Sequence, residues 1–175
     1  MRNTMATAEE ITIANKTSRN SAAIGANAIT PKMVRKYIED NSLDKDETLI
    51  LDFGAGKAAA HAQKFVEDGY QCLAYEFGDN VDPRVHCELA LLNKYDIIYA
   101  SNVINVQSSF PMLHETLIHV KQSLKPDGVF FANYPLSPRK MDITGAKMHA
   151  KMREYFDNVI RVGGTNQAPL WLMKY

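Results

Sequence analysis

Two acids and two glycines near the middle of the chain have the spacing of a site for a nucleoside-bearing ligand. Asp52 closes an apolar run, and Gly54 and Gly56 follow it in a short turn. Glu76 stands at the end of a second apolar stretch. Glycines let the backbone turn tightly and let a ligand approach it closely. A carboxylate such as Glu76 can accept hydrogen bonds from both hydroxyls of a ribose.

Alternating strands and helices are expected to position these residues. Hydrophobic periodicity and turn signals predict both kinds of element. Helices are expected from Thr30 as N-cap and Pro31 to about residue 40, and over 58–68, 109–123 and 146–156. Strands are expected over 48–53, 71–77, 85–89, 96–100, 129–133, 159–162 and 170–174. A sharp turn is expected at 125–128.

This order predicts an α/β fold, a Rossmann-like doubly wound and mostly parallel sheet with helices on both faces. The last two strands are joined without room for a helix, so they should form a C-terminal antiparallel strand pair. We expect one domain over residues 29–175. Residues 1–28, of which the first 20 or so are polar, are expected to form an N-terminal arm that covers the substrate site.

The glycine pattern alone also fits an NAD-binding site. Two features favour another cofactor. Asp52 precedes Gly54 by two residues, where a carboxylate suits an ammonium group and not a pyrophosphate. The chain ends at Tyr175, which leaves little room for a second nucleotide-binding half.

Four segments together resemble class I S-adenosylmethionine-dependent methyltransferases. Residues 51–56 resemble the first motif of that family, and Tyr75-Glu76-Phe77 is similar to its ribose-binding motif. Residues 95–106 resemble the family's fourth strand and the loop after it, and 124–130 resemble the turn before its fifth strand. The resemblance covers about residues 45–175.

The resemblance implies S-adenosylmethionine as the cofactor and a role for each matching residue. Asp52, Gly54, Ala55 and Gly56 would hold its methionine part, Glu76 its ribose and Phe77 its adenine. Ser101, Asn102 and Val103 would line the floor near the sulfonium. Other interpretations stay open: Asp52 could cap the turn, Phe77 could pack in the core, and Asn102 could hydrogen-bond only the loop.

The methyl acceptor is expected to be a small molecule or a nucleic-acid-related group. Candidate catalytic or acceptor-contacting residues are Asn105, Tyr134 and Arg139, together with the arm near Arg19, Ser21 and Asn27. The Arg139-Lys140 pair could clamp the acceptor or be a solvated loop. Methyl transfer needs little beyond holding nucleophile and methyl group in line. The alternatives are an NAD-binding redox or regulatory domain, and a non-catalytic cofactor-binding module that acts through a partner.

Composition limits the other possibilities. The 20 basic and 20 acidic residues cancel, so no global charge favours nucleic acid or an anionic membrane. Cys72 and Cys87 fit no zinc-site spacing, and we expect no metal. We also expect no membrane span and a cytoplasmic location, because the sequence has neither a long apolar run nor a secretory signal. The oligomeric state is not predicted.

Overall fold

The fold is a six-stranded sheet between two pairs of helices, as seen in a computed structural model that describes residues 7–10 and 28–175. The strand order in this part of the chain is β2-β1-β3-β4-β6-β5. The strands are β1 (Leu49–Phe53), β2 (Gln71–Tyr75), β3 (Tyr95–Ala100), β4 (Leu124–Asn133), β5 (Asn158–Gly164) and β6 (Pro169–Lys174). The long helices are α2 (Ile29–Asp40), α3 (Ala60–Glu67), α4 (Phe110–Ser123) and α5 (Gly145–Met152).

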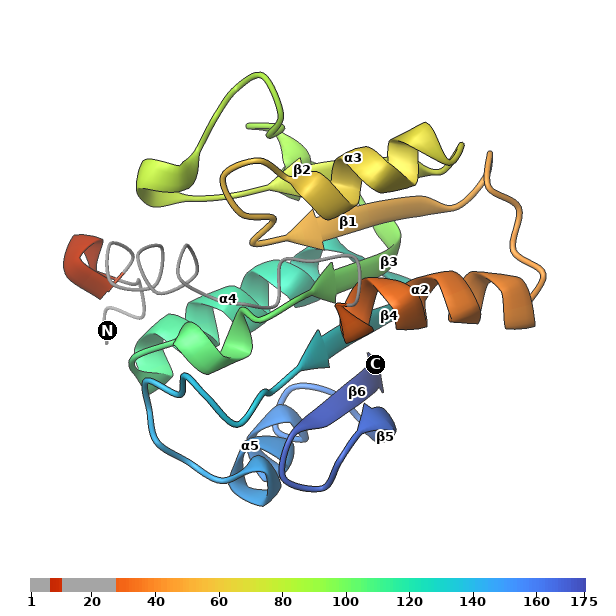
Figure 1. The fold of residues 1–175 in the computed structure, drawn as a ribbon. Helices are drawn as coiled ribbons and strands as arrows, with labels where there is room; N and C mark the ends of the chain where they lie inside the picture. The colour runs from red at the N-terminus through yellow and green to blue at the C-terminus, as the bar shows by residue number, and fades with distance from the viewer. Residues whose placement is uncertain (1–6, 11–27) are drawn as a thin grey trace.

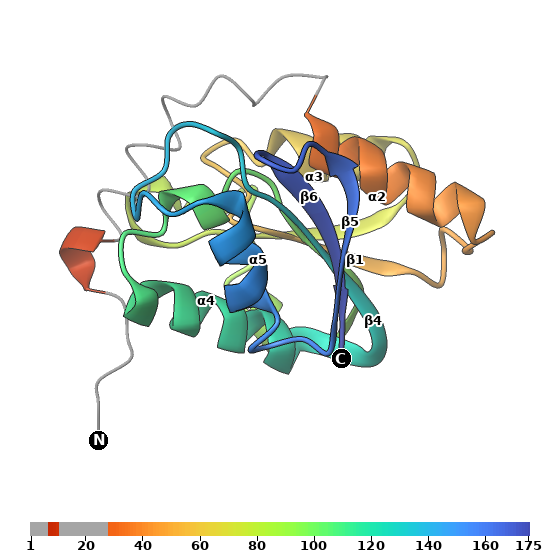
Figure 2. The same cartoon turned by 90° about the horizontal axis from the view of Figure 1, so that it is seen from below.

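The predicted fold class is confirmed. Strands β2, β1, β3 and β4 pair in parallel, whereas β6 pairs antiparallel with both β4 and β5. Helices α2 and α3 cover one face of the sheet, and α4 and α5 cover the other (Figures 1 and 2).

Each face of the sheet has its own apolar core. Val34 and Phe65, from α2 and α3, pack with alternate side chains of β1 and β3. Leu117 and Met148, from α4 and α5, pack in the second core on the opposite face. Side chains of a strand alternate between faces, so strands buried on both sides read as continuous apolar runs.

The strand expected at 85–89 is absent from the described structure, and that prediction was wrong. The amides of Val85 and His86 both donate to the carbonyl of Asp82, so the backbone coils instead of extending. One hydrogen bond, from the Cys87 amide to the Ala74 carbonyl (2.8 Å), ties this loop to β2. Within the described residues, β2 is therefore an edge strand of the sheet.

Several element boundaries also differ from expectation, and two of them have a clear cause in the backbone. Helix α2 begins at Ile29, and its N-cap is Ala28 and not Thr30, whose buried hydroxyl finds no hydrogen-bond partner among the described residues. Residues 125–128 lie inside β4 as a strand irregularity. Tyr95 pairs with Leu124 but Ile97 pairs with Val129, so the extra residues bulge out of the ladder.

Within the described residues, no helix is both long and apolar enough to cross a membrane.

Candidate cofactor site

The predicted site residues come together at one edge of the sheet. The arrowheads of β1, β3 and β4 point to the same side in Figure 1, and the segments that follow these strands gather there. Ligands of doubly wound sheets bind beyond the carboxyl ends of the strands, where the strand order reverses. Here the reversal lies between β1 and β3, next to the glycine turn.

The glycine turn is fixed against the end of β2. The amides of Gly54 and Ala55 both donate to the Tyr75 carbonyl, at 2.9 and 3.0 Å. Gly54 has φ +73°, and a Cβ there would lie 2.6 Å from Cγ2 of Val103. A side chain at this position would therefore be strained and would collide with the loop after β3.

Gly56 faces open space instead. Its φ is +79°, and a Cβ built on it would meet nothing within 4 Å. The missing side chain thus leaves room in which a ligand can approach the backbone.

Glu76 joins the glycine turn to the end of β2. Its Oε2 accepts the Gly56 amide at 2.8 Å, and its Oε1 accepts the Phe77 amide at 3.0 Å. Burial raises the pKa of this carboxyl, while the two backbone hydrogen bonds act against the rise. Each carboxylate oxygen has a second lone pair, so Glu76 can still accept hydrogen bonds from ligand hydroxyls.

Asp52 is buried, with 2% of its surface exposed, and faces the core under α3. Burial raises its pKa to about 7, and the charge of Glu76 adds to the rise. The Tyr99 hydroxyl and the Ala62 amide oppose it. No described residue offers Oδ2 a hydrogen bond of normal geometry. Burial disfavours the ionised carboxylate, and a cationic ligand group beside the unsatisfied oxygen would favour it again.

The loop after β3 forms the floor beside this turn. Asn102 adopts φ +57°, and its amide donates to Oδ1 of Asn133 at 2.8 Å. Nδ2 of Asn133 returns a hydrogen bond to Oδ1 of Asn102 at 2.7 Å. This reciprocal pair locks the ends of β3 and β4 together and orients Ser101 and Val103.

Phe77 is half-buried at the end of β2. Its ring lies 6.2 Å from the ring of Tyr75 and packs against Val106 and Met112. The side chain therefore has both a packed face and a partly exposed one.

Tyr134 and Arg139 are held within their own loop. The Tyr134 hydroxyl donates to the Ile143 carbonyl at 2.8 Å. The Arg139 guanidinium donates to the carbonyls of Pro135, Ile143, Tyr134 and Gln167, and stacks over the Tyr134 ring at 4.0 Å. These contacts favour a role in shaping the loop after β4, and a catalytic role for either residue stays a prediction.

Asn105 lies between this loop and the segment after β3. Its Nδ2 donates to the Pro138 carbonyl at 3.0 Å, and its carbonyl accepts the Lys140 amide at 3.0 Å. Its Oδ1 is buried and lacks a hydrogen-bond partner in the described part of the chain. Asn105 thus retains an acceptor that a ligand could use.

His86 lies against the glycine turn, a contact that the sequence did not predict. Its Nε2 lies 2.7 Å from the carbonyl of Gly56, and its Nδ1 accepts the Asp82 amide at 2.8 Å. The contact joins residues 30 positions apart. In the sequence, His86 marks only the region in which the family's adenine-contacting acid is expected, and its contact with Gly56 depends on the coiled path of the loop.

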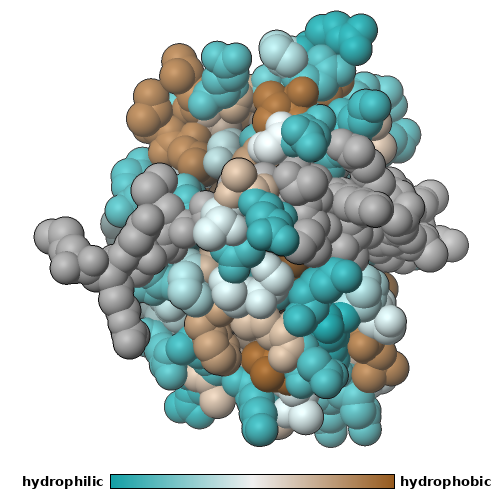
Figure 3. Space-filling view, turned by 90° about the vertical axis from the view of Figure 1, so that its left-hand side faces the viewer, coloured by the Kyte–Doolittle hydropathy of each residue, from teal (hydrophilic) through white to brown (hydrophobic). Residues whose placement is uncertain are grey.

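Figure 3 views the edge at which the strands end. Hydrophobic atoms gather in its upper part, over the segment after β2, where Val81, Leu89 and Leu92 are exposed. Over residues 7–10 and 28–175, no group of three or more His, Cys, Asp or Glu side chains is placed to hold a metal.

The sheet order, the glycine turn and the two acids define a doubly wound α/β protein with a nucleoside-type site. A family model described as a methyltransferase domain matches residues 27–162, and the chain belongs to this methyltransferase family. The predicted S-adenosylmethionine-dependent class is thereby confirmed, and with it S-adenosylmethionine as the cofactor. The family match gives no support to the NAD alternative.

Solved structures share the fold at low sequence identity. A TehB-like S-adenosylmethionine-dependent methyltransferase from Corynebacterium glutamicum is 15% identical with a TM-score of 0.57, over 95% of this chain and 98% of that one. Magnesium protoporphyrin IX methyltransferase from Synechocystis, solved with bound S-adenosylmethionine, is 10% identical with a TM-score of 0.58, over 95% and 97%.

A third solved structure is that of a methyltransferase named for a different kind of acceptor, an RNA. The 16S rRNA N2 G1207 methyltransferase of T. thermophilus, in complex with its cofactor and guanosine, is 14% identical with a TM-score of 0.52. The alignment covers 89% of this chain and 44% of that one. The fold thus occurs with varied acceptors. No curated protein sequence matches the chain.

Proposed function

We propose that this methyltransferase binds S-adenosylmethionine around the glycine turn and transfers its methyl group to a small-molecule or nucleic-acid-related acceptor. The observation that carries the proposal is the pair of buried acids at the ends of β1 and β2. Asp52 keeps an oxygen without a hydrogen-bond partner among the described residues, and Glu76 keeps free lone pairs beside the open space at Gly56.

The proposed roles follow from this arrangement. Asp52 and the backbone of Gly54, Ala55 and Gly56 hold the methionine part, where a carboxylate favours an ammonium group. Glu76 accepts the ribose hydroxyls. The half-buried ring of Phe77 supports the adenine through its exposed face.

The loop after β3 is proposed to lie next to the reacting methyl group. Ser101, Asn102 and Val103 form this floor, whose position the Asn102–Asn133 pair fixes. When bound, the cofactor supplies an electrophilic methyl group on a sulfonium. The protein contributes mainly by aligning the two reactants, which is worth several kcal/mol of the barrier.

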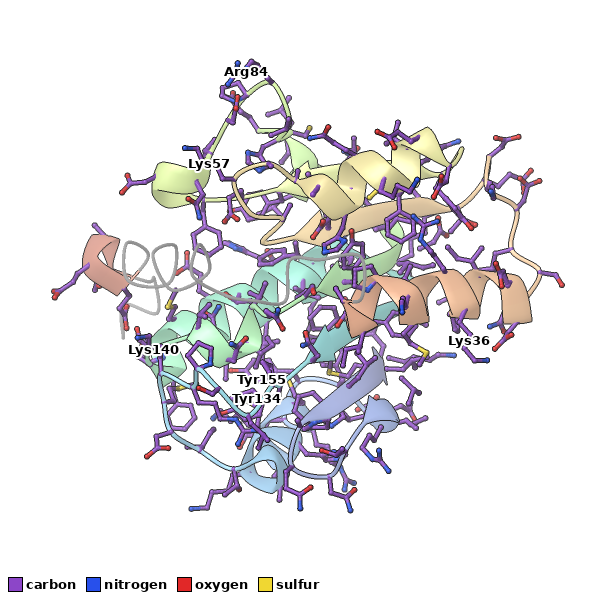
Figure 4. All side chains as sticks on the ribbon, in the orientation of Figure 1. Lys36, Lys57, Arg84, Tyr134, Lys140 and Tyr155 are labelled. Atoms are coloured by element: carbon purple, nitrogen blue, oxygen red, sulfur yellow. The ribbon has the colours of Figure 1, made fainter. Side chains whose placement is uncertain are left out.

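The acceptor side is proposed to be formed by the loop after β4. Asn105 offers its buried Oδ1 to the acceptor, while Tyr134 and Arg139 hold the loop in shape. Lys140 lies on the side of the strand ends, as does Lys57 across the site, whereas Lys36 lies on α2 away from it (Figure 4). With Arg139 occupied by carbonyls, the exposed Lys140 is the better candidate to clamp an anionic acceptor.

The N-terminal arm, residues 1–28, is proposed to cover the acceptor side. Glu10 belongs to the described part of this arm. Its Oε1 accepts a hydrogen bond from the hydroxyl of Ser109, the N-cap residue of α4. This contact brings residues 7–10 to the first turn of α4, close to the loop after β3. Arg19, Ser21 and Asn27 lie outside the described residues.

We also propose a cytoplasmic location. Cys72 and Cys87 are both free thiols, which fits a reducing compartment.

The test of the cofactor site is calorimetry with S-adenosylhomocysteine. Asp52→Ala and Glu76→Ala should each weaken binding by about 1–3 kcal/mol, the loss expected for a charged hydrogen-bond partner. Lys36→Ala, on the far part of α2, is the matched control. Unchanged affinity in both acid variants, with the fold intact, would show that the site lies elsewhere.

The acceptor class can be tested separately. Transfer of radiolabelled methyl from S-adenosylmethionine should be followed into small-molecule and RNA fractions of a cell extract. Label in a small-molecule or an RNA fraction selects between the two acceptor classes. Cofactor binding without turnover on any fraction would favour the non-catalytic module.

A further inference from the structure

His86 touches the glycine turn at the residue that faces open space. The imidazole is 6% exposed, and its Nε2 lies 2.7 Å from the Gly56 carbonyl. Gly56 is also the residue whose amide binds Glu76. The N–H and the C=O of this one glycine are therefore both held by side chains from the segment that follows β2.

The second ring nitrogen fixes the proton of the imidazole. The Asp82 amide donates to Nδ1 at 2.8 Å, so Nδ1 must be the unprotonated nitrogen. Nε2 then carries the hydrogen and donates it to the Gly56 carbonyl. The ring is thus neutral, with a defined tautomer, and it is positioned by the backbone of its own loop.

The contact joins a coiled loop to the glycine turn. The expected strand at 85–89 is absent from the described structure, and the Cys87 amide makes one backbone bond to β2. The side chain of Asp82 is itself occupied by Arg84 through Oδ1 and Oδ2. His86 therefore provides the link from the coiled loop to the glycine turn.

We propose that His86 is a positioning residue for the cofactor: its neutral Nε2–H form clamps the Gly56 peptide in the orientation that receives the methionine and ribose parts. This role rests on the proposed cofactor site. It differs from that of Glu76, which we expect to touch the ligand, because His86 acts through the backbone of Gly56. Loss of the clamp frees the Gly56 carbonyl to rotate and lowers affinity without removing a ligand contact.

Two isosteric substitutions separate the two hydrogen bonds of the ring. Glutamine places its amide nitrogen near the position of Nε2, so His86→Gln can still donate to Gly56. Asparagine places its side-chain oxygen near Nδ1, so His86→Asn can still accept from Asp82 but does not reach Gly56. His86→Ala loses both bonds, and His119→Gln on α4 is the matched control.

Affinity for S-adenosylhomocysteine, by calorimetry, is the first readout. We expect His86→Ala and His86→Asn to weaken binding about tenfold, whereas His86→Gln stays within about threefold of the natural chain. A merely structural role would lower the melting temperature of the variants without this order of affinities. Equal affinities for the Gln and Asn variants, or natural affinity in the Ala variant, would overturn the proposal. If His86→Ala does not fold, the Gln and Asn pair decides.

Nuclear magnetic resonance of the ligand-free protein supplies the second readout. The ¹⁵N shifts of His86 should show a protonated Nε2 and an unprotonated Nδ1. Amide exchange at Gly56 should be faster in His86→Asn than in His86→Gln. If the natural chain binds no S-adenosylhomocysteine, the proposed function is wrong. The tautomer of His86 and the amide exchange at Gly56 would still test whether His86 holds the Gly56 peptide in place. The opposite tautomer, or equal exchange in both variants, would refute it.

Discussion

Binding of S-adenosylhomocysteine is expected to weaken about tenfold between pH 8 and pH 6 through the carboxyl of Asp52. Burial raises the pKa of this group to about 7 in the ligand-free chain. The ionised form is the one that binds an ammonium group, so binding releases a proton where Asp52 was protonated. A group with this pKa is about one-tenth ionised at pH 6 and about nine-tenths at pH 8, which gives the tenfold ratio.

Calorimetry in buffers of different ionisation enthalpy measures both the affinity and the proton released. Asp52→Asn is the control, because it keeps the shape of the side chain and removes its charge. The variant should bind more weakly at pH 8 and should lose most of the dependence on pH. A natural chain with the same affinity at pH 6 and 8, or an Asn variant that keeps the tenfold change, would show that Asp52 does not control the pH dependence of binding.

Further predictions concern stability and cofactor affinity. Asp52→Asn should stabilise the ligand-free protein at pH 8 by up to about 4 kcal/mol, because the pKa of the carboxyl is 3.8 when solvated and about 7 when buried. The gain in stability, measured by thermal melts, should shrink as the pH falls from 7 toward 4. Gly54→Ala should cost about 3 kcal/mol in urea unfolding, against about 1 for Gly56→Ala, because Val103 fills the space at Gly54. For Gly56→Ala, the loss of binding free energy for the cofactor should exceed the loss of unfolding free energy. Tyr134→Phe should cost about 1 kcal/mol of stability and leave S-adenosylhomocysteine affinity intact by calorimetry, since its hydroxyl binds Ile143.

The sheet and the glycine turn could be predicted because their signals are local. Asp52, Gly54 and Gly56 lie within one strand and its turn, and Glu76 ends the next strand. Parallel pairing of the two strands then brings the acid beside the glycines. The antiparallel β5–β6 pair was predictable for a similar reason, since a short connection allows only that direction.

Features that depend on the path of a loop could not be predicted. An apolar Val85 suggested a strand, but the carbonyl of Asp82 coils the backbone and turns His86 toward Gly56. Arg139 looked like a clamp for an anion, yet carbonyls of its own neighbourhood occupy the guanidinium. Such partners are set by tertiary structure and leave no pattern in the sequence.

We expect the cofactor to bind at the carboxyl ends of β1, β2 and β3. A groove of about 430 Å³ between α3, β2 and the loop at 84–87, lined by Gln63, Val66 and His86 among others, is a competing location on the same molecule. Titration of ¹⁵N-labelled protein with S-adenosylhomocysteine tests the claim most directly. We predict the largest amide shifts at Gly54, Gly56, Phe77 and Val103. Shifts confined to Gln63, Val66 and the groove beside them would contradict the account.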